Sequence, residues 1–207
     1  MLPQPGPAAM QEAQEQARAQ FRAWWHTPHA VVVDTETTGL GDRAALLDFA
    51  AVPLATEQIT PAPILSFLCQ PPENAEWSEA ARAMHQGRPT WAVSCGIETF
   101  SAPLRDVLCN SSVLAYGAKF ETDRLRFALT QADADPGFPA ISCVMETYAP
   151  LVERWSESRG LWKAVRLEEA CRREGVDTSD LQPHTAYGDA VATARLIRAV
   201  ATRPEVF

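Results

Sequence analysis

Residues 31–40 read VVVDTETTGL and place two acids at the end of an apolar run. The three valines are β-branched and favour a buried strand. Side chains two positions apart in a strand point to the same side, so Asp34 and Glu36 project together. Two carboxylates in one partly buried place repel each other unless a cation lies between them or one stays protonated. Because carboxylate oxygens prefer hard ions, the stretch predicts a Mg²⁺ or Mn²⁺ site; the alternative is an exposed turn with two solvated acids.

Length and charge bound the class of protein. The chain has 207 residues, of which 46% are hydrophobic, so one domain with a sizeable core is expected. Its formal net charge of −8 would repel nucleic acid from much of the surface. This argues against a protein that reads a base sequence or shapes DNA. It does not argue against an enzyme that holds one strand end through bound cations.

Cysteine usage and the N-terminus bear on the cellular compartment. Five cysteines lie far apart without a CxxC pair, which predicts reduced and mostly buried thiols. The first residues lack the basic, apolar and cleavable parts of a signal peptide. The apolar run 44–55 is interrupted by Asp48 and is too short to span a bilayer. We therefore expect a cytoplasmic protein with no membrane partner.

Apolar patterning and breaker residues predict an N-terminal helix, followed by strands and then interleaved helices. This order favours an α/β sheet of mixed direction. Trp24 and Trp25, at the end of the first helix, are expected to pack in the core. The expected strands are 30–34, 45–54, 64–68 and 112–115, with a further apolar segment at 141–145. The expected helices are 8–25, 79–85, 97–107, 120–131, one beginning near residue 147, 166–174, and one from residue 188 or 189 to 200; residues 153–163 are left unassigned.

Two further groups of polar residues lie later in the chain. Residues 183–197, PHTAYGDAVATARLI, place His184 five positions before Asp189, at the expected start of the last helix. An acid there is also an ordinary helix cap, and the pair gains meaning only as a base beside a metal ligand. Residues 113–129, VLAYGAKFETDRLRFAL, carry Glu121 and Asp123. These two acids lie about 200° apart on a helix, so only one of them can face a given site.

Together the three segments resemble the DEDDh exonuclease family of the DnaQ-like superfamily. DTETTG at residues 34–39 matches the first motif of that family, DxETTG. The third motif, HxxxxDAxAT, is matched from His184 through Asp189 to Thr193, and residues 115–125 resemble the second motif, HNAxFDxxxL. ARAMHQG at residues 81–87 resembles the IHG stretch of the family, and residues 143–155, CVMETYAPLVERW, are similar to stand-alone bacterial members.

The resemblance covers most of the chain and implies its fold and its division. It implies a ribonuclease H-like mixed β-sheet flanked by α-helices. Residues 1–28 would be a mostly helical N-terminal extension, and residues 29–207 would be the exonuclease domain.

The second motif departs from the family at three positions. Tyr116 stands where His is common, Gly117 where Asn is common, and Glu121 where the acid is normally Asp. Aligning the neighbouring Phe and Leu of the motif puts Glu121 at the metal position, and Asp123 stays the alternative. A glutamate is one methylene longer but still reaches a metal, directly or through water. The departure therefore bears on the level of activity more than on the type of reaction.

The resemblance implies a 3′–5′ exonuclease that uses two divalent ions, Mg²⁺ or Mn²⁺, and releases nucleoside 5′-monophosphates. Asp34 would bridge both ions, Glu36 and Asp189 would complete the shell of one, and Glu121 would serve the other. His184 would take the proton of the attacking water. The proposed contacts to the 3′-terminal nucleotide are Thr37, Thr38, Gly39 and Leu40. Lys119, Arg124 and Arg126 are either phosphate contacts or ordinary helix-surface charges.

The expected substrate is the 3′ end of single-stranded or frayed DNA, with RNA as an open alternative. Because bases would stack on apolar faces, little base specificity is expected. A polymerase partner is an option that the chain does not require. Two rival functions are a polymerase-bound proofreader and a nucleic-acid-binding protein whose catalysis has decayed. Metal-dependent release of nucleotides separates the enzymes from that binder.

Overall fold

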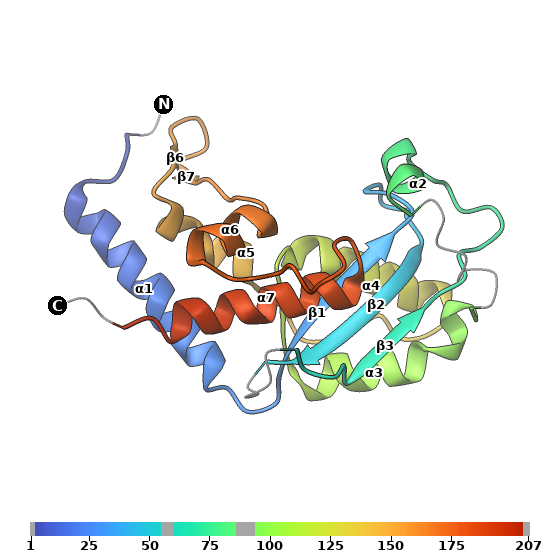
Figure 1. Ribbon diagram of the computed structural model, residues 1–207. Helices are drawn as coiled ribbons and strands as arrows, with labels where there is room; N and C mark the ends of the chain where they lie inside the picture. The colour runs from blue at the N-terminus through green and yellow to red at the C-terminus, as the bar shows by residue number, and fades with distance from the viewer. Residues whose placement is uncertain (1–2, 55–59, 86–93, 205–207) are drawn as a thin grey trace.

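Five strands form one mixed sheet with the order β3-β2-β1-β4-β5 (Figure 1). The central strand β1 (Ala30–Thr37) is antiparallel to β2 (Leu46–Pro53) and parallel to β4 (Ser112–Ala115). β3 (Leu65–Leu68) and β5 (Ser142–Cys143) complete the two edges. The computed structural model describes residues 3–54, 60–85 and 94–204. The mixed sheet expected from the sequence is confirmed.

Helices cover both faces of this sheet (Figure 1). A separate buried cluster of apolar side chains packs each layer of helices against the strands. One face carries α1 (Pro7–Trp25), α5 (Val144–Tyr148), η3 (Ala149–Val152), α6 (Leu167–Glu174) and α7 (Ala186–Ala201). The other face carries η2 (Ile97–Thr99), α3 (Ser101–Asn110) and α4 (Ala118–Gln131). α2 (Glu79–His85) follows β3, and a short hairpin of β6 (Trp155–Ser156) and β7 (Leu161–Trp162) precedes α6.

The central strand β1 continues further than the sequence predicts. It extends through Thr37, so Glu36 lies within the strand together with Asp34 and not in the turn after it. Its valines are buried on both faces: Val32 in the cluster under α7, Val31 and Val33 in the cluster under α3 and α4. Alternation along the strand then turns Asp34 and Glu36 to the α7 side. The pairing with β2 becomes irregular between Glu36 and Thr37, just past the second acid.

The start of α7 is defined by its capping residue. Thr185 accepts the backbone N–H of Gly188 at 3.0 Å, so the helix begins at Ala186, slightly earlier than expected. A side chain at position 188 would place its Cβ 2.3 Å from the carbonyl oxygen of Gln182, which explains the glycine there. Asp189 therefore lies in the first turn of α7.

The N-terminal helix α1 is packed firmly onto the domain. Phe21 is fully buried, and Trp24 is 8% exposed. The Phe21 ring meets Trp24 and Tyr148 edge-to-face, at centroid distances of 5.3 and 6.3 Å. Core packing is thus confirmed for Trp24. Trp25 is only partly buried, with the Arg198 guanidinium 5.8 Å from its ring.

Several local expectations need correction. The helix expected at 97–107 is divided into η2 and α3, and the helix expected near residue 147 begins at Val144, directly after the two-residue strand β5. The unassigned segment 153–163 contains the β6–β7 hairpin. The cysteines are free, but only Cys69 and Cys171 are buried. Of the helices in the described ranges, none is long and apolar enough to cross a membrane.

Candidate active site

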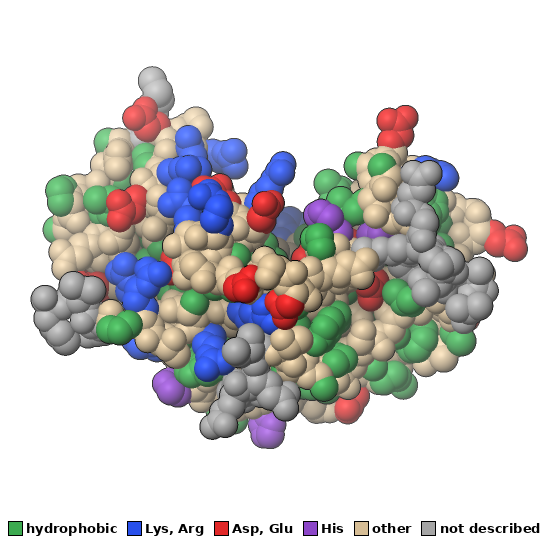
Figure 2. All heavy atoms as spheres, in the orientation of Figure 1, with side chains coloured by type: hydrophobic (Ala, Val, Ile, Leu, Met, Phe, Trp, Pro, Cys, Tyr) green, Lys and Arg blue, Asp and Glu red, His purple; other side chains and the backbone are tan. Residues whose placement is uncertain are grey.

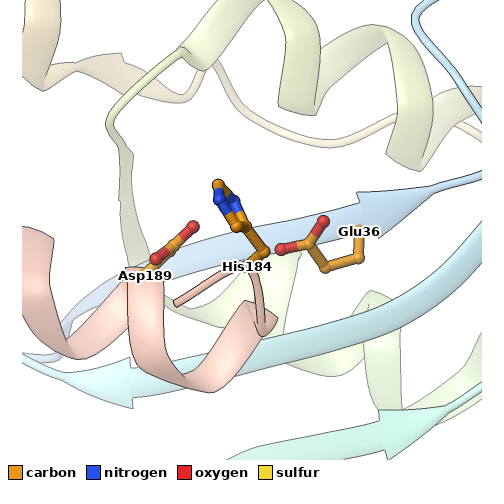
Figure 3. A group of neighbouring side chains, drawn as sticks. All are labelled: Glu36, His184 and Asp189. Atoms are coloured by element: carbon orange, nitrogen blue, oxygen red, sulfur yellow. The ribbon is translucent and has the colours of Figure 1, made fainter. Parts of the chain in front are cut away.

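Three side chains from separate parts of the chain meet beside β1. Glu36 comes from the strand, Asp189 from the first turn of α7, and His184 from the loop before that helix (Figure 3). One ligand atom from each of the three lies within 4.8 Å of the others. His184 adopts a left-handed backbone conformation, with φ of 57°, and its side chain is exposed. The sequence motifs at residues 34–39 and 184–193 thus converge in space.

Asp34 lies among the other acids of this site. Burial is the main cause that raises the pKa of its carboxyl well above the ordinary value. The carboxylates of Glu121, Asp189 and Glu36 add to this rise, in decreasing order. The repulsion predicted from the sequence is therefore present in the fold, and a metal ion would relieve it.

Glu121 and Asp123 lie in opposite environments on α4. The Glu121 side chain is 4% exposed, and burial raises the pKa of its carboxyl to about 8. Its Oε2 atom is buried without a hydrogen-bond partner in the described part of the chain. The Thr35 hydroxyl lies near enough to lower this pKa in part, although the two groups fall outside hydrogen-bond geometry. Asp123 is exposed and bonds Lys119 at 2.8 Å, so only Glu121 faces the other acids.

A fifth carboxylate, which the sequence reasoning did not assign to the site, lies on β2. Asp48 is 6% exposed, pairs in register with Glu36, and adds to the rise in the Asp34 pKa. Its Oδ2 accepts the backbone N–H of Ala186 at 3.1 Å. Asp48 therefore holds the N-terminus of α7 against the sheet, next to His184 and Asp189. The available signal was a lone acid inside the apolar run 44–55.

A second histidine also reaches the site. His85, at the end of α2, is 4% exposed, and its Nε2 lies 3.5 Å from Glu36 Oε2. From the sequence, residues 81–87 show only a resemblance to the IHG stretch, and no role in the site is predicted for His85. Residues 86 and 87 of that segment fall outside the described residues.

The turn after β1 is shaped by its own hydroxyls. Thr37 donates to the carbonyl of Gly39 at 2.6 Å, while the Thr38 hydroxyl accepts the N–H of Ala45 at 3.0 Å. Thr38 is fully buried, and its own N–H and carbonyl are also bonded within the fold. Leu40, in contrast, is 84% exposed at the tip. The polar residues of the turn thus hold Leu40 out beside the site.

Arg124 differs from the surface charge that the sequence suggested. Its side chain is buried at 4% exposure and donates to the carbonyl oxygen of Gly41. Its guanidinium also lies 5.8 Å from the Phe120 ring and partly lowers the pKa of Glu121. Arg124 thus ties the turn after β1 to α4. Of the other two helix cations, Lys119 is paired with Asp123, and Arg126 is exposed.

Tyr116 stands where the resembled family commonly has His. It follows β4 directly and is 8% exposed, and its hydroxyl donates to the carbonyl oxygen of Val165 at 2.7 Å. Burial raises its pKa far above the ordinary value, so the hydroxyl stays protonated. Tyr116 therefore anchors the segment that joins β7 to α6.

The donors at this site fit hard divalent cations. Asp34, Glu36, Glu121 and Asp189 offer carboxylate oxygens, the ligands that Mg²⁺ and Mn²⁺ prefer. The buried Glu121 oxygen without a partner and the raised pKa of Asp34 are both features that a bound cation would resolve.

Solved structures share this architecture. E. coli exonuclease I in complex with a dA16 oligonucleotide matches with a TM-score of 0.63 and 19% identity, over 82% of this chain and 40% of that chain. A zinc-bound complex of E. coli exonuclease I with single-stranded DNA gives 0.66 and 19%, over 84% and 40%. An exonuclease I structure interpreted in terms of processivity gives 0.65 and 21%, over 84% and 41%. This chain has the fold of the matched part of exonuclease I. The expected ribonuclease H-like sheet is confirmed.

The likeness has a defined extent. The chain spans about two fifths of the length of those exonuclease I chains, 41% in the case of the processivity structure. No protein-family model and no curated protein matches the chain. At 19–21% identity, the shared property is the fold.

Proposed function

We propose that this protein is a metal-dependent 3′–5′ exonuclease. It would release nucleoside 5′-monophosphates from the 3′ end of single-stranded or frayed DNA, with RNA as an open alternative substrate. The observation that carries the proposal is the meeting of Asp34, Glu36, Glu121 and Asp189 with His184 beside the central strand β1. The complexes of exonuclease I with single-stranded DNA give independent support for the substrate class.

Four carboxylates would hold two divalent cations. Asp34 would contribute to both positions, Glu36 and Asp189 to one, and Glu121 to the other. When bound, such ions lower the pKa of a water and offset negative charge on a phosphodiester. With both cations bound, the four carboxylates would all be ionised, because the cations would offset their mutual repulsion.

His184 would accept the proton from the attacking water. Imidazole is the side chain that most often acts as a general base, and the exposed position of His184 in the loop before α7 leaves it accessible to water. The left-handed backbone at this residue directs the side chain toward Glu36 and Asp189 (Figure 3).

The turn after β1 would receive the 3′-terminal nucleotide. Thr37 and Gly39 would contact the terminal sugar, and Thr38 would keep the turn in shape through its buried hydrogen bonds. Leu40, which is exposed at the tip, would lie against the terminal base. An apolar contact of this kind accepts any base, so little sequence preference is expected.

Digestion of a 5′-labelled single-stranded DNA tests the proposal. With Mn²⁺ or Mg²⁺ we expect a ladder that shortens from the 3′ end, absent with EDTA. Asp34→Ala should lower the rate by about 100-fold or more, because a ligand of both cations is lost. Asp123→Ala is the matched control on an exposed acid and should digest like the wild type. No metal-dependent release from DNA or RNA by the folded wild type would refute the proposal.

A further inference from the structure

One eight-residue segment near the site is basic in an otherwise acidic protein. Residues 159–166 read RGLWKAVR, with three cations and no acid, in a chain of net charge −8. We name this segment the basic arm. It runs from the hairpin turn through β7 to the residue before α6.

The cations of the basic arm are exposed and have no carboxylate partner within the described ranges. Arg159, Lys163 and Arg166 are exposed, and none of them takes part in an ion pair among the residues that the structure describes. Nearby cations on the same face are paired with carboxylates: Arg195 bonds Asp180 at 2.7 Å, and Arg154 bonds Glu169 at 3.3 Å. The charge of the arm thus remains available for an anionic ligand.

The basic arm is tied to the sheet near the end of the central strands, where the acids lie. Tyr116 donates to the carbonyl oxygen of Val165, between Lys163 and Arg166. Tyr116 follows β4, which is parallel to β1, so it lies at the same end of these two strands as Asp34. Further along, the Cys171 thiol donates to the carbonyl of Ala192 on α7, and Asp189 adds to the rise in the Cys171 pKa. The arm and α6 therefore lie beside the site.

The space-filling view agrees with this placement. Figure 2 shows Lys and Arg side chains gathered over the hairpin and α6, on one side of a hollow, while α2 lies on the other side. Trp155 and Trp162 pair directly across the hairpin, with ring centroids 5.2 Å apart, and each is partly exposed. Leu161 is 47% exposed. Cations next to aromatic and apolar faces are the combination that holds a single strand, because phosphates meet the cations and bases stack on the faces.

We propose that the basic arm binds the single strand that extends from the active site, several nucleotides away from the 3′ end. The proposal rests on the exonuclease function only for the direction in which the strand runs. Lys163 and Arg166 would contact phosphates near the site, and Arg159 with the hairpin would contact the strand further away. The arm would thereby let an acidic protein hold a long strand that its overall charge would repel.

Binding to strands of two lengths tests the arm. The full chain carries His184→Ala in every protein compared, and Mn²⁺ is present. The four carboxylates that would hold the cations thus stay intact, while the proposed base is lost and cutting is slowed. The affinities of 5′-labelled dT20 and dT3 are measured by fluorescence anisotropy at several salt concentrations. The test variant is Lys163→Ala with Arg166→Ala. The matched control is Arg18→Ala with Arg105→Ala, on α1 and α3, which removes two cations that have no assigned role in binding.

For dT20, the test variant should bind about tenfold more weakly than the wild-type arm. The slope of log affinity against log salt should fall in magnitude by about 1.4, that is, about 0.7 for each lost phosphate contact. Binding of dT3, too short to reach the arm, should change less than about twofold, and the control pair should bind dT20 normally. In a second test, Trp162→Phe should lose part of the tryptophan fluorescence change that dT20 causes. Equal unfolding temperatures of the variants verify that the fold is intact.

Three results would refute the proposal that the basic arm binds the strand. They are an unchanged dT20 affinity in the test variant, an equal loss of affinity for dT3 and dT20, and an equal loss of dT20 affinity in the control pair. The exonuclease function is refuted by a different result, namely that the wild type releases no nucleotide from dT3 with Mn²⁺. A wild type that binds dT20 through the arm without cleaving it would support strand binding by the arm and refute the exonuclease function.

Discussion

Glu121 and Asp123 are two positions apart on α4, and only the first is buried against the acids of β1. We expect Glu121→Ala to lower nucleotide release by about 100-fold, because a cation ligand is lost. Asp123→Ala should stay within about twofold, since an exposed pair with Lys119 contributes little. Single-turnover rates on a labelled oligomer measure both. A larger loss of rate for Asp123→Ala would mean that Asp123, and not Glu121, is the fourth cation ligand.

Asp48 acts at the residue scale through the N–H of Ala186 that it accepts. Asp48→Ala leaves that buried N–H without its acceptor and should cost about 1–3 kcal/mol of unfolding free energy. It should also lower the turnover rate, because the first turn of α7 carries Asp189. Asp48→Asn keeps an acceptor oxygen and should restore most of the rate at similar stability. If Asn and Ala were equally slow at full stability, the charge of Asp48 and not its hydrogen bond would matter.

At the scale of elements, α1 contributes a side chain to the main core. The division into an extension at 1–28 and an exonuclease domain at 29–207 remains a proposal, but Phe21 is fully buried between them. Phe21→Ala should lower the unfolding free energy by about 3–5 kcal/mol, as for other large core truncations. Gln20→Ala, on the exposed side of the helix, should change it by less than about 0.5 kcal/mol. Urea denaturation measures both; a small effect of Phe21→Ala would mean that α1 is dispensable.

The elements differ in how far the sequence predicts them. β4 was predicted with its observed bounds because its short apolar run lies between clear breaks. For β1 and α7 the sequence predicted the element but not all of its bounds: β1 continues to Thr37 and α7 begins at Ala186. β5 has two residues and exists only through pairing with β4, a non-local contact that no local pattern encodes. The β6–β7 hairpin depends in the same way on Trp155 meeting Trp162. The motifs predicted the carboxylates that we propose as metal ligands. Asp48 and His85 could not be found in this way, because their contacts are with residues distant in sequence.

At the scale of the whole molecule, the buried acids link stability to pH. Burial raises the pKa of Glu121 from 4.5 to about 8, and that of Asp34 is also raised. Between about pH 4.5 and pH 8, Glu121 keeps a proton in the metal-free native state that it has released in the unfolded chain. The unfolding free energy therefore falls as pH rises through this range. In EDTA, the unfolding temperature should therefore drop between about pH 5 and pH 8, and less steeply in Glu121→Gln. Circular dichroism melts at several pH values measure this. Equal slopes of unfolding temperature against pH for the wild type and Glu121→Gln would mean that Glu121 does not belong to the buried cluster of acids.

Divalent cations should restore the unfolding free energy that is lost as pH rises, because they bind the native state with its acids ionised. Calorimetric titration of the full chain with Mn²⁺ at neutral pH is the most direct measurement of the central claim, that the acids beside β1 form a two-cation site. We expect two bound ions per chain with release of protons, one ion lost in Glu121→Ala, and no binding at either position in Asp34→Asn. Asp123→Asn should bind like the wild type. Undetectable Mn²⁺ binding by the folded wild type, or binding that Asp34→Asn leaves intact, would contradict the account.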